Sequence, residues 1–138
     1  MANTTDRLSN MLAVFPSPAP IDMARTLDLA GFRWKAVSSA EEAAKSEPAE
    51  GWSGAIIMCD EDPEGGWSLC RSLRKRDVPV ERILVLVNGG QLPDLELRDD
   101  LFDDFCLAPF HPRELEARVR HMFWFEIKGN RESLIEYS

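Results

Sequence analysis

The sequence is poor in several features that would point to particular classes of protein. Its 138 residues include only three cysteines and two histidines, and its longest apolar runs are far too short to cross a membrane. The first ten residues lack a basic region followed by a long apolar segment, so no secretion signal is expected. There is no internal repeat and no low-complexity tract. These absences predict a cytoplasmic protein of one domain with a single core.

Basic side chains are also scarce. The 16 lysines and arginines face 24 aspartates and glutamates, which gives a net charge of -8. A chain this acidic is not expected to bind nucleic acid or an anionic membrane by itself. Any contact with DNA would have to come from another part of the protein.

The cysteines and glycines suggest no cofactor site. Cys59, Cys70 and Cys106 lie in apolar runs without the spacing of metal ligands, so we expect reduced, buried thiols rather than disulfides or zinc. The glycine pairs at 65–66 and 89–90 lack the Lys-Ser/Thr or the spaced glycines of a nucleotide-binding loop. The sequence therefore predicts neither a metal nor an organic cofactor.

Strand and helix patterns alternate along the chain. The third and fourth expected strands are apolar throughout, as central strands of a parallel sheet covered on both faces should be. The last helical pattern begins at Pro112, which suits the first turn of a helix. Because parallel neighbours need crossover connections, we predict an α/β three-layer sandwich around a five-stranded parallel sheet. The expected strands are 11–15, 32–37, 54–59, 82–87 and 104–108.

The most specific motif is DDFCLAPFHPRELEARVR, at residues 103–120. A strand that ends in a Pro-Phe pair, followed by a second proline and a Glu-Leu pair, resembles the receiver domain of two-component response regulators. With the order of elements, the resemblance covers about residues 10–125. It implies the flavodoxin-like, CheY-like (βα)5 fold. The Glu-Leu-x-Ala-Arg run resembles most the OmpR-like branch, which carries a winged-helix DNA-binding domain after the receiver.

Most of the active site that this resemblance implies is missing. Receivers of this family hold Mg²⁺ with an acidic pair just past the first strand, where this sequence has Phe15, Pro16 and Ser17. The lysine that contacts a phosphorylated aspartate falls on Ala108. The hydroxyl residue that closes the fourth strand falls on Val87, which cannot donate a hydrogen bond.

The position of the phosphoacceptor is open. The register of the family puts Cys59 in the acceptor's place and Asp60 one residue beyond, so Asp60 would be the remnant of the site. Alternatively, the acids at 60–64 form a solvated turn. Without Mg²⁺ or the lysine, transfer to Asp60 would lack the electrostatic stabilisation on which phosphoryl transfer depends. Phe105 lies where the family has its switching aromatic residue, although a buried core phenylalanine would explain it as well.

The resemblance also predicts a surface for self-association. In the winged-helix regulators, the fourth helix, fifth strand and fifth helix pair with their copy about a two-fold axis. Six acids crowd into residues 94–104, and we expect arginines of the last helix in a second subunit to neutralise them. The alternative is pairing within one chain, because Glu114 and Arg118 have the favourable i, i+4 spacing. The residues that match the charged dimer positions are Asp100, Asp103, Asp104, Glu114 and Arg118.

Three functions from different classes agree with these features. The first is a phosphorylation-independent receiver, a regulatory dimerisation module of a transcription regulator. In this interpretation residues 1–127 are the receiver-like domain, and 128–138 are a linker to a DNA-binding domain or a disordered tail. The second is a receiver-like domain that senses a small molecule at the carboxyl ends of its strands. The third, a flavodoxin-like enzyme or cofactor carrier, is disfavoured because no nucleophile and base are paired, so no enzyme is predicted.

Overall fold

The computed structural model describes residues 11–122, which form one parallel five-stranded sheet with its connections. The strands lie in the order β2-β1-β3-β4-β5, which confirms the predicted architecture. After β5 the chain is helical over residues 112–122, here called the helix after β5. The expected end of the receiver-like domain at 127 and the linker at 128–138 lie outside the described residues. The elements are β1 (Met11–Phe15), α2 (Ile21–Leu29), β2 (Arg33–Ala36), α3 (Ala40–Ser46), β3 (Gly54–Met58), α4 (Pro63–Arg74), β4 (Ile83–Val87), the 3-10 segment η1 (Gly89–Leu101) and β5 (Asp104–Leu107).

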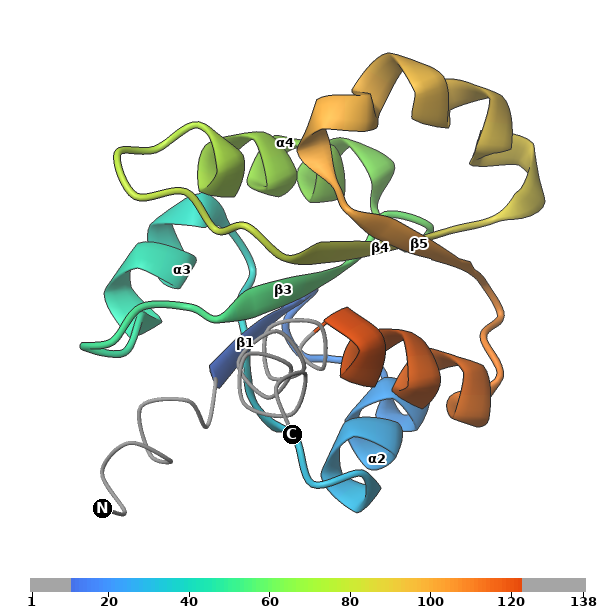
Figure 1. Ribbon diagram of the computed structural model, residues 1–138, viewed down its shortest axis with the longest axis horizontal. Helices are drawn as coiled ribbons and strands as arrows, with labels where there is room; N and C mark the ends of the chain where they lie inside the picture. Colours follow the sequence, from blue (N-terminus) through green and yellow to red (C-terminus); the bar gives the residue numbers. More distant parts are fainter. Residues whose placement is uncertain (1–10, 123–138) are drawn as a thin grey trace, which may run out of the picture.

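The sheet is covered on both faces (Figure 1). α3, α4 and η1 lie on one face, and α2 and the helix after β5 lie on the other. Alternate residues of a strand serve the two layers: Ile57 packs with the core under α4, whereas Ile56 and Met58 pack with the core on the opposite face. β3 and β4 are buried along their whole length, which explains their unbroken apolar sequences. No helix of residues 11–122 is long and apolar enough to span a membrane.

The connection between β4 and β5 departs from a regular βα unit. η1 is a 3-10 segment of 13 residues with a kink at Arg98, where φ is -121° and ψ is 24°. Pro93 lies inside it and supplies no N–H, and glycines at its start disfavour an α-helix. Its buried residues are Leu95 and Leu101, so few apolar contacts hold this segment on the sheet.

An ion pair joins two connections at the amino ends of β3 and β4. The carboxylate of Glu47, just after α3, accepts hydrogen bonds of 2.8 and 2.7 Å from the guanidinium of Arg76, just after α4. The Glu47 side chain is 22% exposed and that of Arg76 is 28% exposed, so water screens the pair only in part. The hydrogen bonds from Arg76 lower the pKa of Glu47.

Replacing Glu47 with glutamine should lower the free energy of unfolding at pH 7 by about 1–2 kcal/mol, as expected for charge-assisted hydrogen bonds. Because folding lowers the pKa of Glu47, its contribution is complete above the pKa of the unfolded chain and is lost as the pH falls through the folded pKa. Urea unfolding should therefore show a difference at pH 7 that shrinks in acid. The control is Glu50→Gln, at an exposed residue. Equal stabilities of wild type and Glu47→Gln at pH 7 would contradict the prediction.

Candidate functional site

A shallow depression of about 270 Å³ lies at the carboxyl ends of the central strands. Open α/β sheets usually bind their ligands at this edge. The segment after β3 contributes Asp60 and Glu61, the start of α2 contributes Asp22, and the segment after β5 contributes Ala108. The resemblance predicts the active site on these same segments. The other lining residues are Met58, Asn88, Pro109 and Phe110.

The structure places Cys59 and Asp60 in different environments. The Cys59 thiol is fully buried on the α4 side of the sheet, where a Cβ on Gly66 would lie 2.9 Å from its Sγ. The backbone N–H of Asp60 donates to the carbonyl of Leu86 at 3.0 Å, which continues the contact between β3 and β4 beyond Met58. Of the two candidates for the acceptor's place, Asp60 is the one that reaches the depression.

The surroundings of Asp60 are electrostatically unfavourable for its charge. Burial raises the pKa of the Asp60 carboxyl, and the nearby carboxylates of Glu61 and Asp22 raise it further, while backbone N–H groups offset part of the effect. Its Oδ1 is buried and has no hydrogen-bond partner among the described residues. The described lining includes no lysine or arginine, and Ala108 stands where the resemblance predicts the lysine of active receivers.

The segment after β1 contributes no carboxylate at the expected positions. Phe15 is 3% exposed and belongs to the core under α4, and Pro16 and Ser17 are half-buried. Asp22, which the sequence analysis missed, reaches the depression from the first turn of α2. The sequence did carry a signal for Asp22, because it is an acid in the first turn of the helix that follows the first strand.

The residues present do not fit the magnesium ion that the resemblance implies for active receivers. Mg²⁺ demands near-octahedral oxygen ligands, usually carboxylates and water. Asp22, Asp60 and Glu61 all line the depression, yet no three potential ligands within residues 11–122 are arranged to hold a metal ion.

The two remaining switch positions belong to the core on the α4 side. Val87 is fully buried there, and Phe105 is partly buried against the same cluster. Gln91, another residue that sequence reasoning missed, connects the ends of β3 and β4. Its side-chain carbonyl accepts from the N–H of Asn88 at 2.8 Å, and its amide donates to the carbonyl of Cys59 at 3.2 Å. The Gln91 side chain therefore joins the segments after β3 and β4 through polar contacts.

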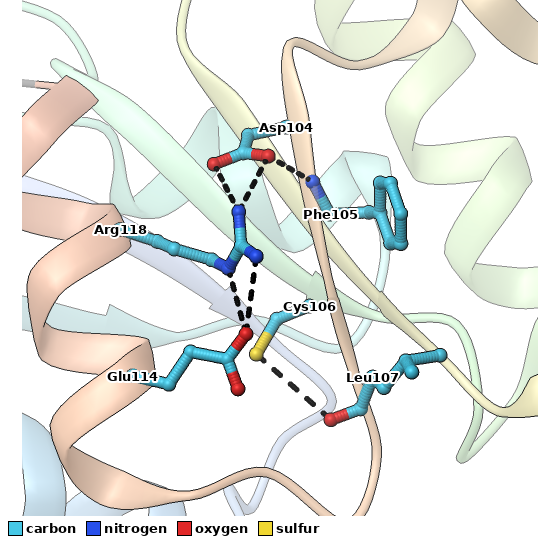
Figure 2. A network of polar contacts seen from close by, with 6 residues as sticks. All are labelled: Asp104, Phe105, Cys106, Leu107, Glu114 and Arg118. Carbon is cyan, nitrogen blue, oxygen red and sulfur yellow. Dashed lines mark hydrogen bonds and ion pairs between the residues drawn. The ribbon is translucent and has the colours of Figure 1, made fainter.

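The charged residues of the predicted dimer surface are paired within the chain. Figure 2 shows Arg118, from the helix after β5, between the carboxylates of Asp104 and Glu114, with contacts of 3.1 Å to each. Asp104 also accepts from the N–H of Phe105 at 2.8 Å. The i, i+4 pairing that the sequence analysis kept as an alternative is therefore present, together with a second carboxylate from β5.

The other two acids of that surface face α4. Asp103 forms an ion pair of 2.8 Å with Arg74 and accepts from the N–H of Ile83, and Asp100 lies 3.5 Å from Lys75. The sequence analysis expected these acids to need cations from a second subunit, and that reasoning was wrong, because the last residue of α4 and the residue after it supply the cations. Arg74 and Lys75 meet acids that lie 29 and 25 positions away in the sequence.

Two further side chains at this helix bond to backbone groups. Arg120 donates to the carbonyl of Ala30 at 2.9 Å, and its guanidinium lies 5.1 Å from the ring centroid of Phe32. His111, just before the helix, accepts from the N–H of Arg113 through Nδ1 at 3.1 Å. It thereby satisfies a free N–H at the start of this helix.

Asp60→Asn should stabilise the fold at neutral pH. Because folding raises the pKa of Asp60, the ionised carboxylate costs stability above its folded pKa, and this cost disappears as the pH falls below the pKa of the unfolded chain. The variant should therefore have a higher melting temperature than wild type at pH 7, with a smaller difference in acid. Glu64→Gln, at an exposed residue of α4, is the control. A melting temperature at pH 7 equal to or below that of wild type would count against it.

Comparison with known proteins gives partial relatives and a clear fold. No family model matches the chain. "Probable transcriptional regulator ycf27" of Porphyridium aerugineum is 40% identical over 57 residues, which are 40% of this chain and 22% of that protein. The protein of the same name from Cyanophora paradoxa is 37% identical over 59 residues, which are 41% of this chain and 23% of that protein. The matches thus span less than a quarter of either relative's length.

Solved receiver domains match nearly all of the described fold. The receiver domain of Francisella response regulator 1452 has a TM-score of 0.67 and 18% identity, and covers 85% of this chain and 98% of that one. The receiver domain of the Pseudomonas aeruginosa kinase PA1611, solved with magnesium in its active-site cleft, gives 0.66 and 18%, with 83% and 97% covered. NtrX from Brucella abortus gives 0.69 and 15%, with 90% and 29% covered. The chain therefore has the CheY-like receiver fold.

Proposed function

We propose that this domain is an atypical receiver that acts without phosphorylation, as a regulatory dimerisation module of a transcription regulator and not as an enzyme. The observation that carries the proposal is the environment of Asp60, with Asp22 and Glu61 beside it and no cation in the described lining. A phosphoryl group on Asp60 would add nearly two negative charges next to these carboxylates. Phosphoryl transfer depends mainly on electrostatic stabilisation, which this edge does not supply.

The link to transcription rests on the partial relatives. Both are named transcriptional regulators, and the matched segments are less than a quarter of their length. The proposed division is a receiver-like domain at residues 1–127 and a linker at 128–138 that leads to a DNA-binding domain, in a cytoplasmic protein. The domain itself carries a net charge of -8, which supports contact with DNA through that other domain alone.

The proposed dimer surface consists of η1, β5 and the helix after β5. Its residues Asp100, Asp103, Asp104, Glu114 and Arg118 are paired within the chain, so support for it comes from apolar side chains on the same elements. Leu97 of η1 is 85% exposed and Leu107 of β5 is 44% exposed, and β5 is the edge strand of the sheet. These side chains would form the centre of the interface, and the Asp104–Arg118–Glu114 network would set register at its rim.

Sensing of a small molecule at the carboxyl ends of the strands is a weaker candidate. The depression of about 270 Å³ is smaller than the usual range of ligand pockets, roughly 300–1,000 Å³. Among the described residues that line the depression, there is also no lysine or arginine to balance its carboxylates.

Phosphorylation independence can be tested directly. Wild-type protein incubated with acetyl phosphate and Mg²⁺ should show no mass increase of a phosphoryl group at Asp60, because within residues 11–122 neither a lysine nor a metal site lies there. The measurement is intact-protein mass spectrometry under mildly acidic conditions, with Asp60→Asn as the matched variant. A stoichiometric, Mg²⁺-dependent adduct on wild type that Asp60→Asn loses would refute phosphorylation independence.

The proposed dimer surface can be tested by the association state of the protein. Sedimentation should show a homodimer that Arg118→Glu converts to monomer, because the substitution places three carboxylates together at the rim of the interface. Leu107→Ser should weaken the dimer without changing any charge. The control is Arg120→Glu, which makes the same charge change on the side of the helix that faces Phe32. If the first two variants sediment as wild type does, this surface is not the interface, and thermal melts show whether each variant is folded.

A further inference from the structure

A second concave site lies between α4 and η1, on the layer opposite α2. It has a volume of about 490 Å³, within the usual range of ligand pockets. Five α4 residues line it, and four of them have the spacing i, i+3, i+4 and i+7, which places them on one side of that helix. Arg98, at the kink of η1, forms the other wall. The lining residues are Pro63, Glu64, Trp67, Ser68, Arg71 and Arg98.

Arg98 packs on an aromatic ring at the groove. Its guanidinium carbon lies 4.9 Å from the ring centroid of Trp67, and the aromatic ring, itself only 5% exposed, holds the guanidinium at the groove. Its Nε is buried without a hydrogen-bond partner in the described part of the chain. Arg74, Lys75 and the other paired cations meet carboxylates, whereas no ion pair within residues 11–122 involves Arg98. The donors of a guanidinium that has no anionic partner are available for a ligand.

Arg71 and Ser68 complete a set of donors at the same place. Both are exposed on α4, and Arg71 likewise forms no ion pair within residues 11–122. The groove thus has two positive charges against the one carboxylate of Glu64. On a chain with a net charge of -8, this is a local site of positive charge that would attract anions.

We propose that the groove between α4 and η1 binds a phosphate-type dianion, either inorganic phosphate or the phosphate monoester of a small molecule. The two arginines and the Ser68 hydroxyl come from two elements on different sides of the groove. A tetrahedral oxyanion presents enough oxygen atoms to accept from all three, whereas a carboxylate presents two, and the arginine fork matches phosphate well. Glu64 would accept from a hydroxyl of an ester or from a singly protonated phosphate. This binding does not depend on the proposed function, since Asp60 takes no part in it and the proposed dimer surface contributes only Arg98 of η1 to the groove.

Titration of the full 138-residue chain with sodium phosphate, followed by ¹⁵N NMR at constant pH and ionic strength, tests the proposal. Saturable shifts are expected at Trp67, Ser68, Arg71 and Arg98, including the indole and guanidinium N–H signals. Sodium chloride at the same ionic strength is the reference. A parallel titration with glycerol phosphate distinguishes the sources: tighter binding assigns the site to a monoester, and equal binding assigns it to inorganic phosphate.

Arg71→Gln and Arg98→Gln should each raise the phosphate Kd about tenfold, the loss expected for a charge-assisted hydrogen bond. The matched control is Arg25→Gln, the same change at an exposed residue of α2, which should leave the Kd within about twofold, as for other surface charges far from the site. Unchanged Kd values in both groove variants, or equal shifts with chloride, would overturn the proposal. If Arg98→Gln does not fold, as judged by its NMR spectrum, exposed Arg71 decides the outcome.

Discussion

Burial of both faces of the central strands is the constraint on which the rest of the structure depends. All five residues of β3 and all five of β4 are buried, so these strands can present polar side chains only where they end. The hydrogen bond from the N–H of Asp60 to the carbonyl of Leu86 marks that end. Asp60 therefore meets the segments that follow the other strands because of the topology of the sheet, whatever chemistry the edge performs.

The same alternation decides between the two candidates for the acceptor's place. Ile57 and Cys59 belong to the core under α4, whereas Met58 and Asp60 line the depression. This two-residue period can be read from the sequence, because an apolar Cys59 agrees with a position under a helix. A resemblance to a family transfers positions along the chain, but the pleat of the strand decides which side chain reaches the site.

The architecture and the i, i+4 pair of Glu114 and Arg118 were predictable from the sequence, whereas the long-range charge contacts were not. The parallel sheet followed from apolar runs and from the need for crossovers. The partners of Asp100 and Asp103, by contrast, lie at the end of α4 and just after it, and their contacts depend on how η1 packs. The kinked 3-10 form of η1 comes from Pro93, the glycines and the sparse apolar contacts acting together. The approach of Asp22 to Asp60 was likewise not predictable from local sequence, because it depends on the position of α2.

The apolar residues at the carboxyl edge are consistent with the negative charge of the carboxylates beside them. An acidic pair after β1 would add negative charge beside Asp22, Asp60 and Glu61, and a cation would be needed to balance it. Phe15 instead extends the core. The side chains of Ala108 and Val87 are apolar, so neither of them adds a polar group that would need a partner. A lysine placed at position 108 alone would meet these carboxylates without a metal and would pair with them. If the domain acts without phosphorylation, as proposed, a single substitution would therefore not create phosphorylation chemistry at this edge.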